Sequence, residues 1–573
     1  MASMLNAVLA RKLSIIFVLT DDQDLRMNSL DFMPYLKKHL IEKGTSFKPH
    51  FCTTAICCPS RVSLWTGQLA HNTNVTDVNP PYGGYSKFLS QGLNENYLPV
   101  WLQNSGYNTY YTGKLSNAHT VDNYNSPHAA GWTQSDFLLD PYTYDYLNAS
   151  YQRNHDAPVS FEGQHTVDVL ASKANGLLED AVKEDAPFFL GIAPVAPHSN
   201  VRFPHGDEHF NDPDYVSKVA FTPAISATRH EELFKGVEVP RTPNFNPNKP
   251  SGANWIRERK QLTEDDIEFN DHFYRQRLRA LQSVDELLDG IFGKLEGYGL
   301  LDNTYIFYTT ENGYHISQHR LQPGKECSFE EDINVPLVVR GPGVPKGETS
   351  EIVTTHTDLA PTIMRLVGAP LRASFDREPV PLSRRGVQLE DAISTRHEHV
   401  TVEFWGLAAF EGNIKFEPNR LILNNTYKAV SVISGEYNLL YTVWCTNEHE
   451  LYDLTTDPYQ THNLLHADEQ AHMSANLLGV PIHKVLNRLD SLLFVLKSCK
   501  GQTCVRPWQA LHPQGNVQTL KDALSPRFDD FYVSQKRVEY DHCELGYIIS
   551  AEGPRFETDG HVYRRGVSWH EWV

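Results

Sequence analysis

Short, strongly apolar runs separated by helical stretches constrain the fold of this chain more than any other feature. Residues 13–20, 188–193, 305–309 and 335–339 are rich in aliphatic and aromatic side chains, as in strands that are buried on both faces of a sheet. Between them, residues 276–295 repeat apolar positions every three or four residues, which indicates an amphipathic helix. This alternation predicts an α/β fold built on a large, doubly wound sheet flanked by helices.

The chain is long enough to form a second, smaller structural unit. At 573 residues it exceeds what one hydrophobic core usually organises. After about residue 400 the pattern changes to short strand-like pieces at residues 421–423, 428–433 and 437–442, which predict a small antiparallel sheet. We therefore expect a large domain at residues 1–400 and a C-terminal subdomain at residues 401–573.

The charge of the chain excludes some functions. A formal net charge of -19 argues against a nucleic-acid partner, because a protein that binds a duplex needs a basic face to neutralise phosphates. No stretch approaches the roughly 20 apolar residues that are needed to cross a bilayer. We expect a soluble protein with no nucleic-acid partner and no membrane span, in which the basic groups for any anionic substrate are local.

The N-terminus, the cysteines and the glycosylation sequons bear on the compartment. Residues 1–10 are mildly apolar, but basic residues follow them instead of preceding them, so a clear signal peptide is absent. Cys499 and Cys504 are close enough in sequence to form a small disulfide loop. Sequons also arise by chance and neighbouring cysteines can stay reduced, but together these features favour secretion or the lumen of the secretory pathway. The sequons begin at Asn74, Asn148 and Asn424.

The segment Cys58-Pro59-Ser60-Arg61 predicts an anion site at the start of a helix. Pro59 suits the first turn of a helix, where free N–H groups and the positive end of the helix dipole favour an anion. Arg61 adds a fixed cation one turn later. The alternative is that Cys57 and Cys58 are buried thiols or a disulfide site ahead of a proline-capped helix.

The same segment resembles the C-x-P-S-R signature of the sulfatase family, and the TGQ that follows it matches the family's continuation. The resemblance implies an alkaline-phosphatase-like fold, with a large mixed sheet flanked by helices, a catalytic domain at residues 1–400 and a smaller C-terminal antiparallel-sheet subdomain. It also implies that a cysteine, which we assign to Cys58, is oxidised to formylglycine by the formylglycine-generating enzyme. Residues 356–368 and 450–465 resemble other recurrent sulfatase segments, so the resemblance spans most of the chain.

Two pairs of polar residues follow buried strands and predict a metal site. Asp21 and Asp22 end the first apolar run, and adjacent carboxylates there repel each other unless a cation lies between them. Glu311 and Asn312 follow the third run in the same way. Taken alone, either pair is also compatible with an exposed turn. In sulfatases these positions bind one calcium ion per subunit, together with the modified cysteine assigned here to Cys58, although the family usually has Asp in place of Glu311.

Further residues resemble the sulfate-binding positions of the family. Lys114 in TGKL, His198 in PHS and Lys325 occur in the expected order along the chain, whereas each alone would be read as a solvated lysine or a core histidine. Family members commonly carry Gly-Lys-x-His, but Leu and Ser follow Lys114 here. The nearest histidine is His119, which a longer loop would return to the pocket, and His315 is a second candidate.

By this resemblance the chain is an arylsulfatase, which converts an aryl sulfate and water into a phenol and sulfate. One hydroxyl of the formylglycine hydrate, activated by calcium, attacks sulfur, and the other loses a proton so that sulfate is expelled. Arg61, Lys114 and Lys325 stabilise charge on the sulfuryl oxygens, and His198 or Lys325 protonates the leaving oxygen. Residues 202–260, rich in Pro, Asn and charge, are expected to form a long loop near the cleft, where substrate choice is set.

Three other functions stay open at this stage. The chain could act on sulfated amino sugars, or it could be a phosphonate or phosphate ester hydrolase of the same superfamily. It could also be a non-catalytic calcium- and anion-binding glycoprotein if Cys58 remains a thiol. Rates on sulfate and phosphate esters separate the enzymes, and the mass of the peptide that contains Cys58 decides the last alternative.

Overall fold

A computed structural model describes residues 13–203, 219–386, 396–412, 421–465, 476–556, 562–563 and 567–568 of the chain. The N-terminal segment, on which the prediction about a signal peptide depends, lies outside these residues. Among the described residues, no helix has the length and apolar character needed to cross a membrane.

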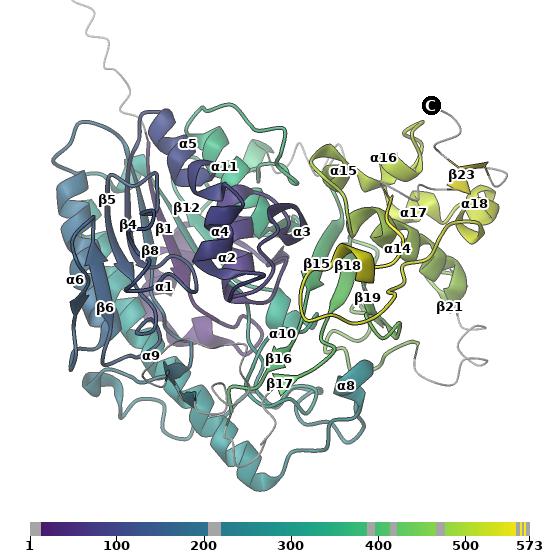
Figure 1. The fold of residues 1–573 in the computed structure, drawn as a ribbon, viewed down its shortest axis with the longest axis horizontal. Coiled ribbons are helices and arrows are strands. Elements are labelled where there is room, and N and C mark those ends of the chain that lie inside the picture. Colours follow the sequence, from purple (N-terminus) through teal and green to yellow (C-terminus); the bar gives the residue numbers. More distant parts are fainter. Residues whose placement is uncertain are drawn as a thin grey trace, which may run out of the picture.

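A ten-stranded mixed sheet forms the centre of the larger part of the molecule (Figure 1). Its middle strands β11, β1, β8, β4 and β5 run parallel, whereas antiparallel pairings occur on both sides of them. The predicted large mixed sheet is thus confirmed. The strands, in the order in which they pair, are β13 (Glu348–Ser350), β2 (Thr45–Phe47), β12 (Leu337–Arg340), β11 (Thr304–Thr310), β1 (Ser14–Thr20), β8 (Phe188–Ala193), β4 (Asn108–Lys114), β5 (Gln134–Leu138), β6 (Ser150–Arg153) and β7 (Val159–Ser160).

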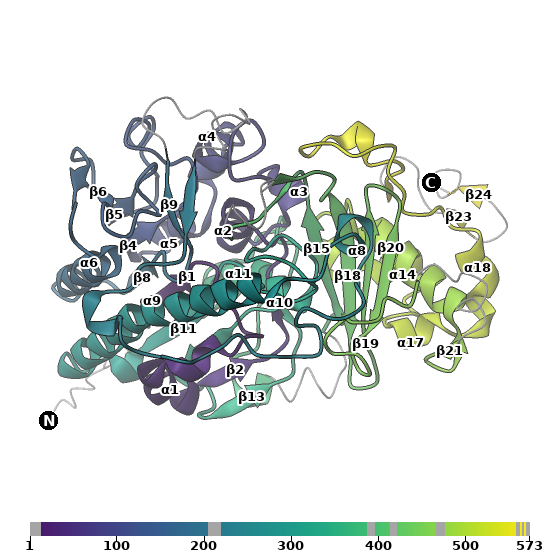
Figure 2. The ribbon, with the colours of Figure 1, turned by 90° about the horizontal axis from the view of Figure 1, so that it is seen from below.

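Helices cover both faces of this sheet, because the buried strands carry apolar side chains on both sides (Figure 2). In β1, Ile16 and Val18 belong to a core that includes α6 and α9 residues, whereas Phe17 points to the opposite face and contacts Trp65 of α2. Burying one such side chain contributes roughly 1.5–3 kcal/mol. The covering helices are α1 (Pro34–His39), α6 (Thr166–Ala181) and α9 (Glu264–Gly297) on one face, and α2 (Cys57–Thr66), α4 (Gly84–Ser90), α5 (Leu98–Asn104) and α11 (Leu359–Leu366) on the other.

The helix predicted at residues 276–295 is the C-terminal part of α9, which begins earlier than its apolar repeat. Thr263 and Asp266 form a capping box at its N-terminus, so the helix starts at Glu264. The segment that precedes it, from residue 223 to Thr263, contains only a short 3-10 helix (Thr228–His230) and the short helix α8 (Asn254–Arg257), in agreement with the predicted loop. Residues 204–218 of that loop lie outside the described part of the chain.

A four-stranded antiparallel sheet lies in the C-terminal region, as predicted (Figure 1). Its strands pair in the order β15 (His399–Phe404), β18 (Tyr427–Ile433), β19 (Asn438–Trp444) and β20 (His449–Asp453), and α14 (Ile482–Leu496) packs against it. The piece predicted at residues 421–423 belongs instead to a separate two-stranded sheet, β16 (Ala408–Ala409) with β17 (Leu421–Ile422). The division near residue 400 stays a prediction.

Two disulfides lie in this C-terminal region. Cys499 and Cys504 form the predicted short loop, and Cys445 pairs with Cys543 across 98 residues. Further short helices and two-stranded sheets occur along the described part of the chain. These elements are α3 (Ala70–Thr73), α10 (Glu330–Ile333), α15 (Gln502–Val505), α16 (Pro507–Leu511), α17 (Leu520–Ala523), α18 (Asp529–Val533), β3 (His50–Phe51) with β14 (Thr354–Thr355), β9 (Asn200–Arg202) with β10 (Ala220–Thr222), β21 (Asn476–Leu477) with β22 (Val480–Pro481), and β23 (Val562–Tyr563) with β24 (Val567–Ser568).

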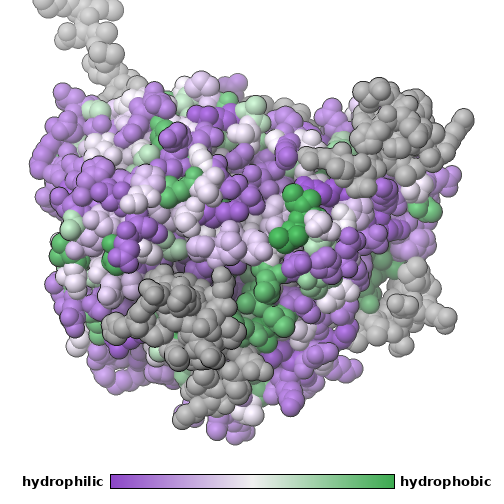
Figure 3. All heavy atoms as spheres, viewed as in Figure 1, coloured by the Kyte–Doolittle hydropathy of each residue, from purple (hydrophilic) through white to green (hydrophobic). Residues whose placement is uncertain are grey.

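The face of the molecule seen in Figure 3 is mostly hydrophilic, with apolar side chains in separate groups. This distribution agrees with the net charge of -19.

Candidate active site

The two predicted pairs of polar residues meet at one edge of the large sheet. Thr20 of β1 is aligned with Thr310 of β11 in the parallel register, so the residues that follow each strand emerge side by side. Asp22 accepts a hydrogen bond of 2.8 Å from the amide of Asn312. Active sites of parallel α/β sheets lie at this carboxyl edge, and all four residues of the two pairs are fully buried.

Two buried cations, Lys114 and Arg61, bind the carboxylates of Asp21 and Glu311. Lys114 Nζ lies 2.7 Å from Asp21 Oδ2 and 3.2 Å from Glu311 Oε1. Arg61 binds the same two carboxylates through its guanidinium group. Glycine at position 113 lets β4 deliver Lys114 here, because a Cβ at that position, where φ is +106°, would overlap the carbonyl of β8.

The neighbouring charges of this site shift the pKa values of Asp21 and Glu311. Burial raises the pKa of Asp21, and the nearby Glu311 carboxylate adds to this effect. Burial acts in the same direction on Glu311, but Arg61 and Lys114 hold the pKa of that carboxyl well below its usual value. Removing one partner of such a buried pair leaves an uncompensated charge, so these four residues depend on one another.

A third buried cation, Lys325, binds the remaining carboxylate, that of Asp22. Its Nζ lies 2.5 Å from Asp22 Oδ2 and 3.1 Å from Glu411 Oε1. Burial would lower the pKa of Lys325, but the Asp22 and Glu411 carboxylates raise it well above its usual value, so the lysine carries a positive charge. His198 lies on the same side, with Nε2 3.5 Å from Asp22 Oδ2 and Nδ1 2.8 Å from the Ser199 carbonyl oxygen.

The structure places the two adjacent cysteines in different surroundings. Cys57 Sγ lies 4.0 Å from Asp21 Oδ1, and ligand atoms of Asp21, Asp22, Cys57 and His198 all lie within 4.8 Å of one another. We call these four residues the central cluster. Cys58 Sγ instead faces Ser116 Oγ at 3.3 Å within the apolar core, so it belongs neither to the central cluster nor to a metal site there.

The physical reason is the direction of side chains in a helix. Helix α2 begins at Cys57, and successive helical residues point about 100° apart, so Cys57 and Cys58 cannot face the same site. The C-x-P-S-R signature has one residue between its cysteine and Pro59, and that residue is Cys58. The cysteine position of the signature and the cysteine of the central cluster therefore coincide at Cys57.

His119, which was also predicted to reach the pocket, lies in an aromatic core. Its ring packs 4.1 Å from the Tyr85 ring and 5.2 Å from the Phe137 ring, and it is fully buried. Neither ring nitrogen has a hydrogen-bond partner among the described residues, and burial lowers its pKa to about 3. The backbone after Lys114 thus directs His119 into the aromatic core. His315, the second candidate, contacts Asp332 at 2.8 Å and is not part of the central cluster.

Two residues that sequence reasoning missed contact this site. Tyr144 places its hydroxyl 3.9 Å from Cys57 Sγ, and Glu411 binds Lys325 as well as the hydroxyls of Ser199 and Tyr314. The tyrosine-rich stretch at residues 142–146 was the available signal for Tyr144. No motif marks Glu411, which follows β16 far along the chain.

The residues at the sheet edge fit a hard divalent cation. The Oδ1 atom of Asn312 is buried and has no hydrogen-bond partner among the described residues, and the amide group that carries it donates to the Asp22 carboxylate. Calcium binds through carboxylate and amide oxygens of this kind. The three cations of the site face four carboxylates, those of Asp21, Asp22, Glu311 and Glu411, so a bound divalent cation would give the site a net positive charge that attracts an anion.

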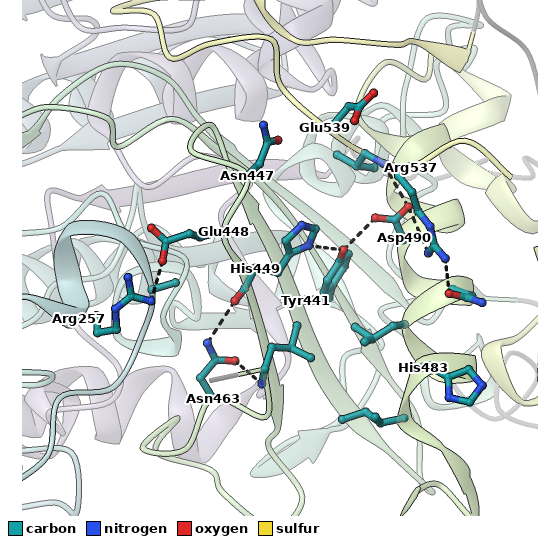
Figure 4. A pocket seen from close by; sticks show the side chains of 16 residues that line it. Arg257, Tyr441, Asn447, Glu448, His449, Asn463, His483, Asp490, Arg537 and Glu539 are labelled. Carbon is teal, nitrogen blue, oxygen red and sulfur yellow. Dashed lines mark hydrogen bonds and ion pairs between the residues drawn. The ribbon is translucent and has the colours of Figure 1, made fainter. Parts of the chain in front are cut away.

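A separate cavity of about 860 Å³ lies in the C-terminal region (Figure 4). Residues from α8, β19, β20 and α14 line it, including Tyr441, His449 and Asp490, which form a hydrogen-bonded chain. No residue of the central cluster is among those that line this cavity.

Comparison with solved structures defines the class of fold. The structure resembles that of BT4656 in complex with its substrate D-glucosamine-2-N,6-O-disulfate, with a TM-score of 0.61, 19% identity and coverage of 80% of this chain and 94% of that chain. It also resembles the phosphonate monoester hydrolase SpPMH from Silicibacter pomeroyi, with a TM-score of 0.52, 16% identity and coverage of 80% and 92%. The fold is that of the alkaline-phosphatase-like hydrolases.

Sequence comparison then gives the family. The Sulfatase family model matches residues 14–369, and the chain belongs to the sulfatase family, a family of sulfuric ester hydrolases. It is 37% identical to an arylsulfatase of Volvox carteri, over 95% of this chain and 83% of that protein. It is 35% identical to an arylsulfatase of Chlamydomonas reinhardtii (99% and 88% covered) and 31% identical to the human N-acetylglucosamine-6-sulfatase (87% and 86% covered).

Proposed function

We propose that this protein is an arylsulfatase that uses a formylglycine made from Cys57 and one bound calcium ion per subunit. The observation that carries the proposal is the position of Cys57, which starts helix α2 beside Asp21 and within the ring of Arg61, Lys114 and Lys325. As a thiol this residue would be a weak nucleophile, because burial raises its pKa well above the ordinary value.

The side chains of the site divide the work on a sulfate monoester. Arg61, Lys114 and Lys325 present fixed positive charge to the sulfuryl oxygens, where negative charge grows in the transition state. The first helical turn of α2 adds free N–H groups. When bound, calcium supplies Lewis-acid polarisation and formylglycine supplies a hydroxyl nucleophile. Asp21, Asp22, Glu311 and Asn312 would hold the calcium ion.

Lys325 is placed to protonate the leaving oxygen. Asp22 and Glu411 account for two of the three N–H groups of its ammonium, which leaves one for the substrate. His198 presents its Nδ1 to a carbonyl oxygen, so this nitrogen carries hydrogen and Nε2 is an acceptor in the neutral ring. We therefore assign the proton donor to Lys325 and a substrate-orienting role to His198.

The named relatives support aryl sulfates as the first substrate class to test. The algal arylsulfatases match 95% and 99% of this chain, and the human N-acetylglucosamine-6-sulfatase matches 87% of it. Sulfated amino sugars are the second candidate, since one structural neighbour is bound to a sulfated glucosamine. The likeness to a phosphonate monoester hydrolase keeps phosphonate and phosphate esters as a comparison.

Steady-state kinetics on four substrates tests the proposal. We expect kcat/KM for 4-nitrophenyl sulfate to exceed the values for N-acetylglucosamine 6-sulfate, 4-nitrophenyl phosphate and a phenyl phosphonate. A preference for the sugar sulfate would move the assignment to the amino-sugar sulfatases. Preference for phosphorus esters would refute it, and an absence of turnover together with an unmodified thiol at Cys57 would indicate a binding protein.

We also propose that the protein matures in the secretory pathway, where it meets the formylglycine-generating enzyme. Two disulfides support this, because such bonds persist in oxidising compartments. The sequon residues Asn74 and Asn148 are partly exposed, and Asn424 is exposed. Treatment of the native protein with a glycosidase specific for N-glycans should lower its mass, and an unchanged mass would argue against glycosylation at these sites.

A further inference from the structure

The hydroxyl of Tyr144 lies beside the sulfur of the reactive cysteine. Tyr144 Oη is 3.9 Å from Cys57 Sγ, and it accepts a hydrogen bond of 2.7 Å from the amide of Asn117. An amide NH₂ group only donates, so the tyrosine's own proton is left to point toward residue 57. Asn117 therefore fixes both the position and the polarity of this hydroxyl.

The ring of Tyr144 contacts two other groups of the site. It stacks on the ring of His198 with centroids 4.1 Å apart and an interplanar angle of 25°. Lys114 Nζ lies 4.8 Å from the centroid of the same ring, in a cation–π contact. Tyr144 is 5% exposed, so packing fixes its orientation from several sides.

The segment after Lys114 provides no other donor to residue 57 among the described contacts. Ser116 faces Cys58, and His119 packs against Tyr85 in the aromatic core. The hydroxyl that reaches Cys57 comes instead from the loop after β5. The position next to the nucleophile is thus filled by a residue distant in sequence from Lys114.

We propose that Tyr144 is a catalytic residue, whose hydroxyl donates a hydrogen bond to the oxygen that replaces the Cys57 sulfur and so orients that oxygen toward the sulfur atom of the substrate. This inference rests on the function proposed above. Tyr144 forms no covalent bond in this role and keeps its own proton. Burial raises its pKa well above the ordinary value, which keeps the phenol a donor across the working pH range.

Kinetics of Tyr144→Phe provide the first test. The variant is made alongside wild type in a host that contains the formylglycine-generating enzyme, and the aldehyde content at residue 57 is measured by mass so that kcat refers to converted protein. We expect kcat for 4-nitrophenyl sulfate to fall about 10- to 100-fold, because one oriented hydrogen bond to a reacting atom is lost. KM should stay within about twofold, since the cations that bind sulfate are unchanged.

Two further variants separate catalysis from folding. Tyr151→Phe removes a buried hydroxyl that bonds Thr166 at 3.2 Å in the core, and it should retain wild-type kcat. Asn117→Ala keeps the Tyr144 hydroxyl but removes the amide that fixes it, so a smaller fall in kcat is expected. An unchanged kcat in converted Tyr144→Phe would overturn the inference while leaving the sulfatase assignment intact. Equal losses in Tyr151→Phe and Tyr144→Phe would also overturn it.

A crystal structure of the converted wild-type protein provides a readout that does not depend on turnover. We expect Tyr144 Oη within about 3.2 Å of an oxygen on residue 57. A separation beyond about 4 Å, or a phenol turned away from residue 57, would overturn the inference even if the enzyme is active. If converted wild type hydrolyses no sulfate ester, the function proposed above fails and the catalytic role of Tyr144 fails with it.

Discussion

At the scale of single residues, the site is a set of paired buried charges. Arg61 and Lys114 share Asp21 and Glu311, while Lys325 binds Asp22. Because each carboxylate is held by a cation, the buried charges are paired even without a bound metal, and the cations can still attract an anionic ester. Single substitutions here should therefore affect turnover far more than substitutions of ordinary surface ion pairs.

Replacement of Lys325 by alanine tests its role as a charge and proton donor. We expect Lys325→Ala to lower kcat for 4-nitrophenyl sulfate by about a hundredfold or more, because the loss of one such donor typically has this effect. Lys173→Ala is the control, since it removes a lysine that pairs with Asp136 at 2.8 Å outside the site. Similar turnover of the Lys325 variant and wild type would contradict the assignment.

The two adjacent cysteines should respond differently to substitution. Cys57→Ala removes the proposed nucleophile and should abolish turnover. Cys58→Ala should remain active and lose on the order of 1 kcal/mol of stability, because Cys58 only fills the apolar core. Activity assays and thermal unfolding on both variants check this, and the reverse pattern would restore Cys58 as the nucleophile.

Site residues could be predicted from the sequence where neighbouring residues alone determine their position. Asp21 and Glu311 directly follow buried strands, and parallel strands end at the same edge, so their meeting could be predicted. The choice between Cys57 and Cys58 depended on the helical phase, and the direction of His119 depended on a loop path that no local pattern encodes. Tyr144 was missed because only the tertiary fold brings it to Cys57.

At the scale of elements, a buried carboxylate joins the C-terminal sheet to the helices beside it. Glu398, which precedes β15, accepts hydrogen bonds from Leu520 N at 2.6 Å in α17 and from Trp508 Nε1 at 3.1 Å in α16. Burial raises the pKa of Glu398 to about 7. The folded protein thus holds a proton here that the unfolded chain releases near pH 4.5.

The stability of the protein should therefore fall as pH rises through this range. A pKa that is raised on folding gives a contribution that is fully present below about pH 4.5 and is lost as pH passes 7, by up to roughly 3 kcal/mol. Glu398→Gln should reduce the fall in unfolding midpoint between pH 5 and pH 8, whereas Glu436→Gln, which changes an exposed carboxylate, should not. The same pH dependence in wild type and Glu398→Gln would refute this explanation.

Element prediction succeeded where the pattern had one interpretation. The apolar run at residues 13–20 became β1, and the helical repeat at 276–295 became part of α9, because burial fixes both. The piece at 421–423 was placed in the wrong sheet, because short strands carry no information about their partners. The N-terminal extension of α9 depended on its capping box and not on its apolar repeat.

At the scale of the whole molecule, buried polar contacts connect the large sheet region to the C-terminal sheet. His71 of α3 contacts Glu403 of β15 at 2.8 Å, and Lys428 of β18 binds the same carboxylate at 2.8 Å. Glu411, which follows β16, reaches Lys325 in the site. The C-terminal region thus contributes to the environment of the active site as well as to the fold.

Removal of calcium should affect stability and turnover together. The proposed ligands directly follow the two central strands β1 and β11, so they are brought together only in the folded protein. An ion that binds only the folded state stabilises it by about 2.7 kcal/mol at a hundred times its Kd. A chelator should abolish turnover and lower the unfolding midpoint, and added calcium should restore both. Asp22→Asn should lose the calcium-dependent shift, and a midpoint insensitive to chelator in wild type would argue against a calcium site.

The measurement that tests the central claim most directly is the fragment mass spectrum of the peptide that ends at Arg61, from protein made with the formylglycine-generating enzyme present. We predict that residue 57 is lighter than cysteine by the exchange of one sulfur for one oxygen and the loss of two hydrogens, while residue 58 is an unmodified cysteine. An intact Cys57, or the aldehyde at residue 58, would contradict this account of the active site.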